Sequence, residues 1–242
     1  MDHELAQVNI DRPVPPEMSA GKVLSVNIGA ERALAEADLG VTGIDKRPVD
    51  GPVAVAAPGA RGTGGSGVAG DRICDLRNHG GDDQAVYAYA REDLDAWAAE
   101  LGRDLPPGVF GENLTTTGLD LTGAVIGERW RVGESLVLEV SCPRIPCRTF
   151  AGWLGERGWV KTFTRRAVPG AYFRVLEPGP VQAGNSVEVL SRPGHGVTIG
   201  TVFRAFTTEP DLLPELTVAE ALPEHDMRKV HRTLERRAAS AG

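Results

Sequence analysis

The sequence predicts a mainly β protein, a barrel or folded sheet, followed by a small helical extension. Thirty glycines and seventeen prolines divide most of the chain into short apolar runs, a pattern typical of strands joined by turns. After Gly196 the apolar residues recur at helical spacing instead. We therefore expect three parts: an N-terminal arm over residues 1–20, a β-barrel domain over 21–195 and a C-terminal helical extension over 196–242.

Alternating and β-branched residues predict the strands of the barrel domain. One helix is predicted within it, over Arg91–Leu101, because Leu94, Trp97, Ala98 and Leu101 fall on one face. The predicted strands are Val23–Ile28, Val53–Ala56, Ala85–Ala90, Ser135–Val140, Tyr172–Leu176 and Ser186–Leu190.

The C-terminal extension is predicted to hold three helices, over Thr198–Thr207, Leu212–Leu222 and Glu224–Ala239. Thr217 precedes Glu220 by three residues, which is the spacing of a capping box. The last helix carries a basic run that suits either a solvated face or a docking site for an acidic redox partner, and the extension is also a candidate surface for a homodimer. The run is Arg228, Lys229, Arg232, Arg236 and Arg237.

Composition excludes several classes of protein. A formal net charge of −7 argues against a dedicated nucleic-acid binder. The N-terminus is polar, and no later run is long and apolar enough to cross a bilayer, so no membrane partner is expected. Three cysteines are too few for a disulfide scaffold, which predicts a reducing, cytoplasmic setting.

One glycine-rich segment matches a dinucleotide-binding motif but does not predict such a site. The segment Gly62–Gly67 matches G-x-G-x-x-G, but a dinucleotide fingerprint needs a helix to open directly after it. The residues that follow include Gly70 and show no helical pattern. We expect a loop here, which could cover a site.

The octapeptide Ser141–Arg148 contains the strongest candidate for a metal ligand or nucleophile in the chain. Cys147 follows two prolines and lies between Arg144 and Arg148, whose charges favour the thiolate that binds metals or attacks electrophiles. A buried structural cysteine is the alternative. A zinc site is disfavoured, because Cys142 and Cys147 have no second paired motif. A hydrolase triad is disfavoured as well, because the chain has no G-x-S-x-G motif and Cys147 has no histidine partner nearby in sequence.

Three sequence segments together resemble the MOSC family, and within it the YiiM-like branch of small stand-alone proteins. They are Arg77–Tyr87, Phe110–Leu114 and Pro143–Cys147. The resemblance implies a MOSC-type closed β-barrel with peripheral helices and a pocket for a pyranopterin molybdenum cofactor. It also implies reduction of N-hydroxylated bases and amidoximes, the detoxification chemistry of that branch.

Carried onto this chain, the resemblance makes Cys147 the molybdenum ligand. His79 becomes a catalytic candidate that donates to a cofactor oxygen or shuttles a proton, or else only holds the Gly80–Gly81 turn. Cys142 and Tyr172 are expected to be structural. The candidates to grip the cofactor are Lys46, Arg47, Arg72, Arg77, Asn113, Arg144 and Arg148, with Lys161 and Arg166 as further basic candidates.

Three functions remain open from sequence. The leading one is a molybdenum-dependent reductase of a small N-hydroxylated substrate. Its electrons would come from an external donor, a ferredoxin or flavin reductase, because the chain has no iron–sulfur pattern and no dinucleotide fold. The alternatives are a sulfur carrier with a persulfide on Cys147 and a non-catalytic cofactor-binding protein.

Overall fold

The computed structural model describes residues 11–13 and 21–241, and the predicted arm over 1–20 otherwise lies outside them. Seven strands close into a mixed barrel in the order β13-β9-β10-β11-β7-β8-β2, with β2 returning to pair with β13. Only β7 and β8 run parallel. The barrel strands are β2 (Gly21–Gly29), β7 (Val86–Ala90), β8 (Leu114–Thr117), β9 (Arg129–Val132), β10 (Leu136–Pro143), β11 (Ala171–Glu177) and β13 (Ser186–Pro193).

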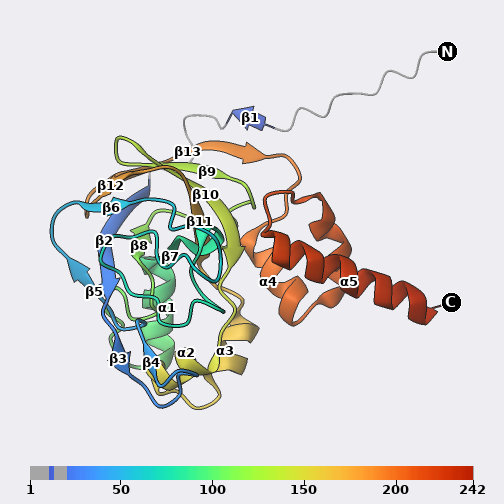
Figure 1. Cartoon of the computed structure of the whole chain (residues 1–242), viewed down its shortest axis with the longest axis horizontal. Helices are drawn as coiled ribbons and strands as arrows, with labels where there is room; N and C mark the ends of the chain where they lie inside the picture. The colour runs from blue at the N-terminus through green and yellow to red at the C-terminus, as the bar shows by residue number, and fades with distance from the viewer. Residues whose placement is uncertain (1–10, 14–20, 242) are drawn as a thin grey trace.

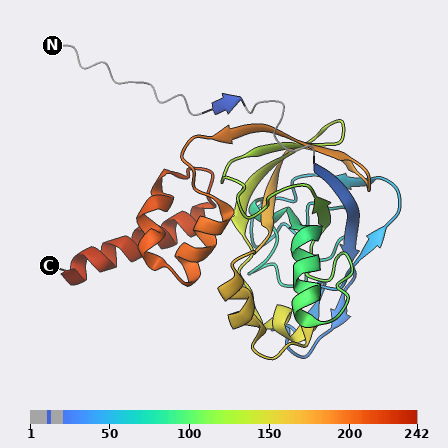
Figure 2. The same cartoon turned by 180° about the vertical axis from the view of Figure 1, so that it is seen from behind.

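Shorter strands and four helices surround the barrel. Strands β1 (Asp11–Pro13) and β5 (Lys46–Val49) extend the main sheet, while β6 (Val53–Val55) pairs with β12 (Gly179–Val181), and β3 (Arg32–Ala33) with β4 (Val41–Thr42). The helices of this domain are η1 (Asp82–Gln84), α1 (Arg91–Leu101), α2 (Arg148–Leu154) and α3 (Trp159–Arg166). Helices α1 to α3 cover one end and side of the barrel, as Figures 1 and 2 show from opposite directions. The predicted closed β-barrel with peripheral helices is confirmed.

Strand β7 has no solvated face. Val86, Ala88 and Ala90 join the core formed mainly by the barrel strands. Tyr87 and Tyr89 point the other way, into an aromatic cluster with residues of α1, α2 and α3. Because both faces are covered, the strand is a continuous buried run, as expected for a strand buried on both sides. The aromatic side of β7 is where the candidate site lies.

The C-terminal extension packs against another side of the barrel (Figure 1). It consists of α4 (Ile199–Thr207), the 3₁₀ segment η2 (Pro210–Val218) and α5 (Glu224–Ala241). Thr198 caps α4, with its hydroxyl accepting a hydrogen bond from the Thr201 N–H at 3.1 Å. The predicted capping box at Thr217 is wrong, because Thr217 lies inside η2 and its hydroxyl donates to the Pro214 carbonyl at 2.8 Å.

No helix among residues 11–13 and 21–241 combines the length and apolar character that crossing a membrane requires.

Candidate active site

A cavity of about 430 Å³ lies outside the barrel wall, where loops fold over the aromatic side of β7 and β11. Its floor includes Tyr87 and Tyr172, which are paired across these two strands with ring centroids 4.7 Å apart. Tyr172 packs against the buried aromatic cluster, in keeping with the expectation of a core residue, and its half-buried side chain also lines the cavity. A cavity of this size is typical of cofactor and ligand sites.

Cys147 lies at the wall of this cavity and immediately precedes α2 as its N-cap residue. Burial raises the pKa of its thiol, but contact with the His79 side chain, the charge of Arg144 and the backbone N–H of Phe150 together lower it to about 6. Helix N-termini and nearby cations favour thiolates in this way. Cys147 is therefore largely a thiolate at neutral pH, the form that binds a soft metal.

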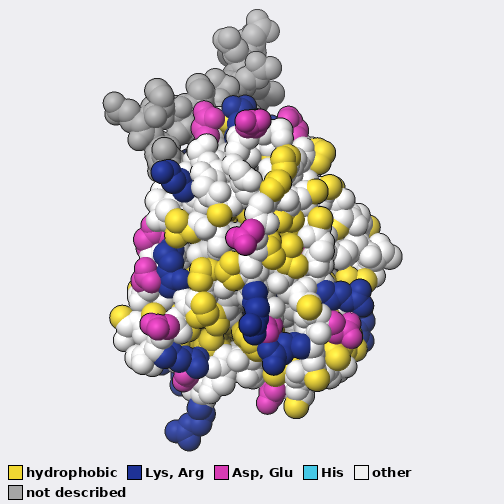
Figure 3. All heavy atoms as spheres, turned by 90° about the vertical axis from the view of Figure 1, so that its left-hand side faces the viewer, with side chains coloured by type: hydrophobic (Ala, Val, Ile, Leu, Met, Phe, Trp, Pro, Cys, Tyr) yellow, Lys and Arg dark blue, Asp and Glu magenta, His cyan; other side chains and the backbone are white. Residues whose placement is uncertain are grey.

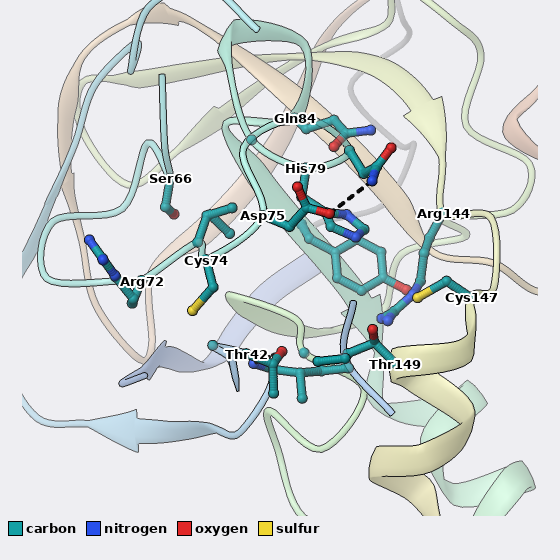
Figure 4. A pocket seen from close by; sticks show the side chains of 18 of the residues that line it. Thr42, Ser66, Arg72, Cys74, Asp75, His79, Gln84, Arg144, Cys147 and Thr149 are labelled. Atoms are coloured by element: carbon teal, nitrogen blue, oxygen red, sulfur yellow. Dashed lines mark hydrogen bonds between the residues drawn. The ribbon is translucent and has the colours of Figure 1, made fainter. Parts of the chain in front are cut away.

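His79 faces Cys147 because of the two glycines that follow it. Gly80 and Gly81 have φ values of 79° and 81°, which favour glycine; a Cβ at Gly80 would strike the backbone of the glycine-rich loop, and one at Gly81 would strike Arg61 just before it. The N–H of Gly81 donates to the Gly65 carbonyl at 3.0 Å. The Gly62–Gly67 segment is thus a loop with no helix after it, as expected, and it fixes the turn that carries His79. Figure 4 shows His79, Arg144 and Cys147 facing the same space.

Arg144 supplies a buried positive charge. Its side chain donates to the Phe110 carbonyl, and its guanidinium carbon lies 3.8 Å from the centroid of the Phe150 ring and 5.3 Å from that of Tyr87. Within the described residues Arg144 forms no ion pair. A buried cation of this kind is stabilised by aromatic faces and by an anion, here the neighbouring Cys147 thiolate or a bound anionic ligand.

A second buried cation is already paired. Lys46 forms a salt bridge with Asp71, and both side chains are almost fully buried. Asp71 also accepts hydrogen bonds from the Gly29 N–H at 2.8 Å and from the Asn113 amide at 2.9 Å. Burial lowers the pKa of Lys46, and Asp71 opposes that effect. This network joins four chain segments and places Lys46 and Asn113 in the wall of the cavity.

The remaining predicted contacts divide into two groups. Arg72 and Arg148 line the cavity at its exposed rim, where they pair with Glu31 at 3.3 Å and Asp38 at 2.8 Å. The lining residues do not include Arg47, Arg77, Lys161 or Arg166.

The four basic residues outside the cavity have other contacts or are exposed. Arg47, on β5, pairs with Asp45. On this side of the molecule acidic, basic and apolar side chains are interspersed (Figure 3). Arg77 is held by Asp75 in an exposed turn. On α3, Lys161 is exposed and Arg166 stacks on Trp97. Charge and proximity in sequence predict these positions, but neither reports the direction of a side chain.

Several residues of the site were missed from sequence. Asp71 orients Lys46 and Asn113 but follows a glycine-rich loop with no pattern to single it out. Cys74 also lines the cavity, yet burial and the neighbouring Glu31 raise the pKa of its thiol, so its chemistry differs from that of Cys147. Other lining residues not predicted are Thr42, Ser66, Asp75, Asn78, Gln84, Tyr87 and Thr149.

The donor set suits a metal that brings most of its own ligands. Among residues 11–13 and 21–241 no three His, Cys, Asp or Glu side chains lie close enough together to hold a metal ion. The cavity instead offers one thiolate, two buried cations and the arginines at its rim. Such a set fits an anionic, phosphate-bearing group whose metal takes a single sulfur ligand from the protein.

Comparison with known proteins agrees with this fold. The sequence profile of the MOSC domain matches residues 75–188. The uncharacterized protein YflK of Bacillus subtilis is 34% identical over 220 residues, which cover 88% of this chain and 96% of YflK. A protein named "Reductase" from Gibberella moniliformis is 30% identical over 84% of this chain, and the match covers 36% of that protein.

The crystal structure of YiiM from Geobacillus stearothermophilus superposes with a TM-score of 0.71 at 25% identity, covering 88% of this chain and 98% of YiiM. This chain belongs to the MOSC domain family, in its YiiM-like branch.

Proposed function

We propose that this protein binds a molybdenum cofactor with Cys147 as the protein ligand to the metal and reduces N-hydroxylated bases or amidoximes. One observation carries the proposal: Cys147 has a pKa lowered to about 6 and lies beside the buried cation Arg144, in the wall of a cavity of about 430 Å³. The name of the Gibberella moniliformis relative supports the reductive direction.

The chain's own residues have separate tasks. Arg144 and Lys46 provide buried positive charge for the cofactor's anionic groups, Asn113 adds an amide, and the exposed Arg72 and Arg148 bind at the rim. When bound, the cofactor supplies a metal that passes two electrons to the substrate. His79 contacts the ligand sulfur and is placed to donate a proton at the cavity wall.

The overall reaction balances with an external reductant. An N-hydroxyl group accepts two electrons and two protons, the N–O bond breaks, and the oxygen leaves as water while an N–H bond forms. A separate redox protein of the ferredoxin or flavin reductase class would supply the electrons. The protons enter from solvent through side chains such as His79.

The test is a reductase assay on 6-hydroxylaminopurine or benzamidoxime, using protein expressed in a host that makes the cofactor and a chemical electron donor. Cys147→Ser is expected to abolish turnover. Cys74→Ser is the matched control, since Cys74 lines the same cavity but has a raised thiol pKa, and it is expected to retain turnover. Equal activity in the two variants would overturn the proposal.

A sulfur carrier is the second candidate, because a lowered thiol pKa also suits a persulfide. Such a carrier needs no bound pterin. Sulfane sulfur on Cys147 in protein that contains neither pterin nor molybdenum, after expression in a competent host, would favour this function over the reductase.

A further inference from the structure

A second, smaller cavity lies at the seam between the barrel and the C-terminal extension. Its volume is about 190 Å³. One wall comes from the loop before β7 and the end of β10, and the other comes from Phe206 on α4 and His225 and Asp226 on α5. The two walls are joined where Arg61 contacts His225, with 2.6 Å between Nη1 and Nε2.

The seam cavity adjoins the candidate active site. Six residues line both cavities: Asn78, His79, Gln84, Arg144, Ile145 and Tyr172. Cys147 lines only the larger one. The two neighbours that favour its thiolate, His79 and Arg144, therefore lie at the junction, so a molecule in the seam cavity contacts the same residues that surround the cysteine.

Gln84 has an unexplained polar group at this junction. The Oε1 atom of its side chain is buried and has no hydrogen-bond partner among the described residues. A buried carbonyl oxygen left unpaired costs roughly 1–3 kcal/mol, so such groups usually have a partner, and a ligand is one way to supply it. In Figure 4 Gln84 lies above His79, over the same space as Arg144.

We propose that the seam cavity binds the reacting end of the substrate and that the Gln84 carboxamide recognises it. The inference rests on the proposed function and names the subsite for its substrate. The ligand is an amidine-like edge, in which an N–H or N–OH group sits beside an unprotonated ring or imine nitrogen, as in a hydroxylaminopurine or an amidoxime. A carboxamide pairs with such an edge through one acceptor and one donor.

The dimensions and the walls agree with this assignment. The seam cavity is smaller than the ~300–1,000 Å³ of sites for drug-sized ligands, so it suits a small planar group and not a pterin. Tyr172 and Phe206 offer aromatic surface. Asp226 lines the same wall, and its carboxylate offers an acceptor for a substrate N–H group.

The C-terminal extension supplies one wall of the proposed substrate subsite. Without α4 and α5 the seam cavity would lack Phe206, His225 and Asp226, and the junction at Gln84 would open to solvent. The extension therefore completes the substrate subsite while the cofactor residues all come from the barrel domain.

The experiment measures binding of adenine, the oxygen-free product, to the cofactor-free chain by calorimetry, and KM for 6-hydroxylaminopurine in the loaded enzyme. Gln84→Met keeps the side-chain length and removes the amide. It is expected to weaken adenine binding and raise KM about tenfold, with kcat little changed. Gln182→Met, on an exposed turn, is the matched control and is expected to match wild type.

Asp226→Asn tests the opposite wall independently and should also weaken adenine binding, which covers the case in which Gln84→Met fails to fold. Unchanged adenine binding and KM in Gln84→Met, or no adenine binding by wild type at millimolar concentration, would overturn the inference. Gln84-dependent adenine binding in a chain without reductase activity would instead sink the redox proposal and leave this binding site in place.

Discussion

The guanidinium carbon of Arg144 lies 3.8 Å from the centroid of the Phe150 ring, so a buried cation is stacked on the first turn of the helix that follows Cys147. The sulfur, the cation and the helix N-terminus are held together by one short segment, residues 144–150. Together with the contact from His79, this arrangement lowers the pKa of the Cys147 thiol although burial raises it.

The acidity of Cys147 is directly measurable in the cofactor-free chain. Because the pKa is lowered to about 6, its alkylation by iodoacetamide is expected to be fast at neutral pH and to fall with a midpoint near pH 6. The low-pH phase should survive in Cys74→Ser and disappear in Cys147→Ser. A midpoint near the ordinary thiol value of about 8.5 would contradict this account.

Removal of the buried cation is expected to weaken the thiolate. Arg144→Met should raise the pKa of Cys147 by roughly one to three units, because an adjacent opposite charge is lost. Arg148→Met is the matched control, because Arg148 also lies beside Cys147 in sequence but is exposed and paired with Asp38, and it should leave the titration unchanged. The same iodoacetamide profile reads out both variants, and equal shifts would refute a specific role for Arg144.

Two neighbouring basic residues should differ sharply in their effect on stability. Lys46→Met leaves Asp71 as a buried, unpaired carboxylate and is expected to lower the free energy of unfolding by about 3–5 kcal/mol. Arg47→Met removes only an exposed pair with Asp45 and should leave the urea midpoint unchanged. Similar midpoints for both variants would show that the Lys46–Asp71 pair does not hold the cavity wall.

The glycine-rich loop should act as a support for His79 and not as a free linker. A Cβ on Gly64 would lie 2.3 Å from the Gly59 carbonyl oxygen, whereas a Cβ on Gly65 would meet nothing within 4 Å. Gly64→Ala is therefore expected to lower the thermal midpoint and raise the pKa of Cys147 by displacing the His79 turn. Gly65→Ala should change neither, and identical behaviour of the pair would contradict the packing described.

Local patterns predicted some elements closely. Helix α1 has the expected bounds, Arg91–Leu101, because its apolar face and the Gly102 C-cap are both local signals. Strand β8 was missed, since three of its four residues, Leu114, Thr115 and Thr116, are buried and no polar alternation marks them. Helix α2 was missed because Cys147 stands at its N-cap without a capping side chain.

Site residues that lie in one short segment could be predicted from sequence, whereas contacts between distant segments depend on tertiary packing and could not. Cys147 and Arg144 share one segment, so their relation could be inferred from sequence, and the structure brings them together in one cavity wall. The contact of Asp71 with Lys46 joins residues 25 positions apart through a loop without pattern. Leu212–Leu222 was expected to be an α-helix, but Pro214 lies within it and the segment forms the 3₁₀ helix Pro210–Val218.

We propose that bound molybdenum takes Cys147 as its protein ligand. Molybdenum per chain should be measured by elemental analysis in wild type, Cys147→Ser and Cys74→Ser, purified in parallel from a host that makes the cofactor. The account predicts near-stoichiometric molybdenum in wild type and Cys74→Ser and its loss in Cys147→Ser. Equal molybdenum in the two cysteine variants, or none in wild type, would contradict it.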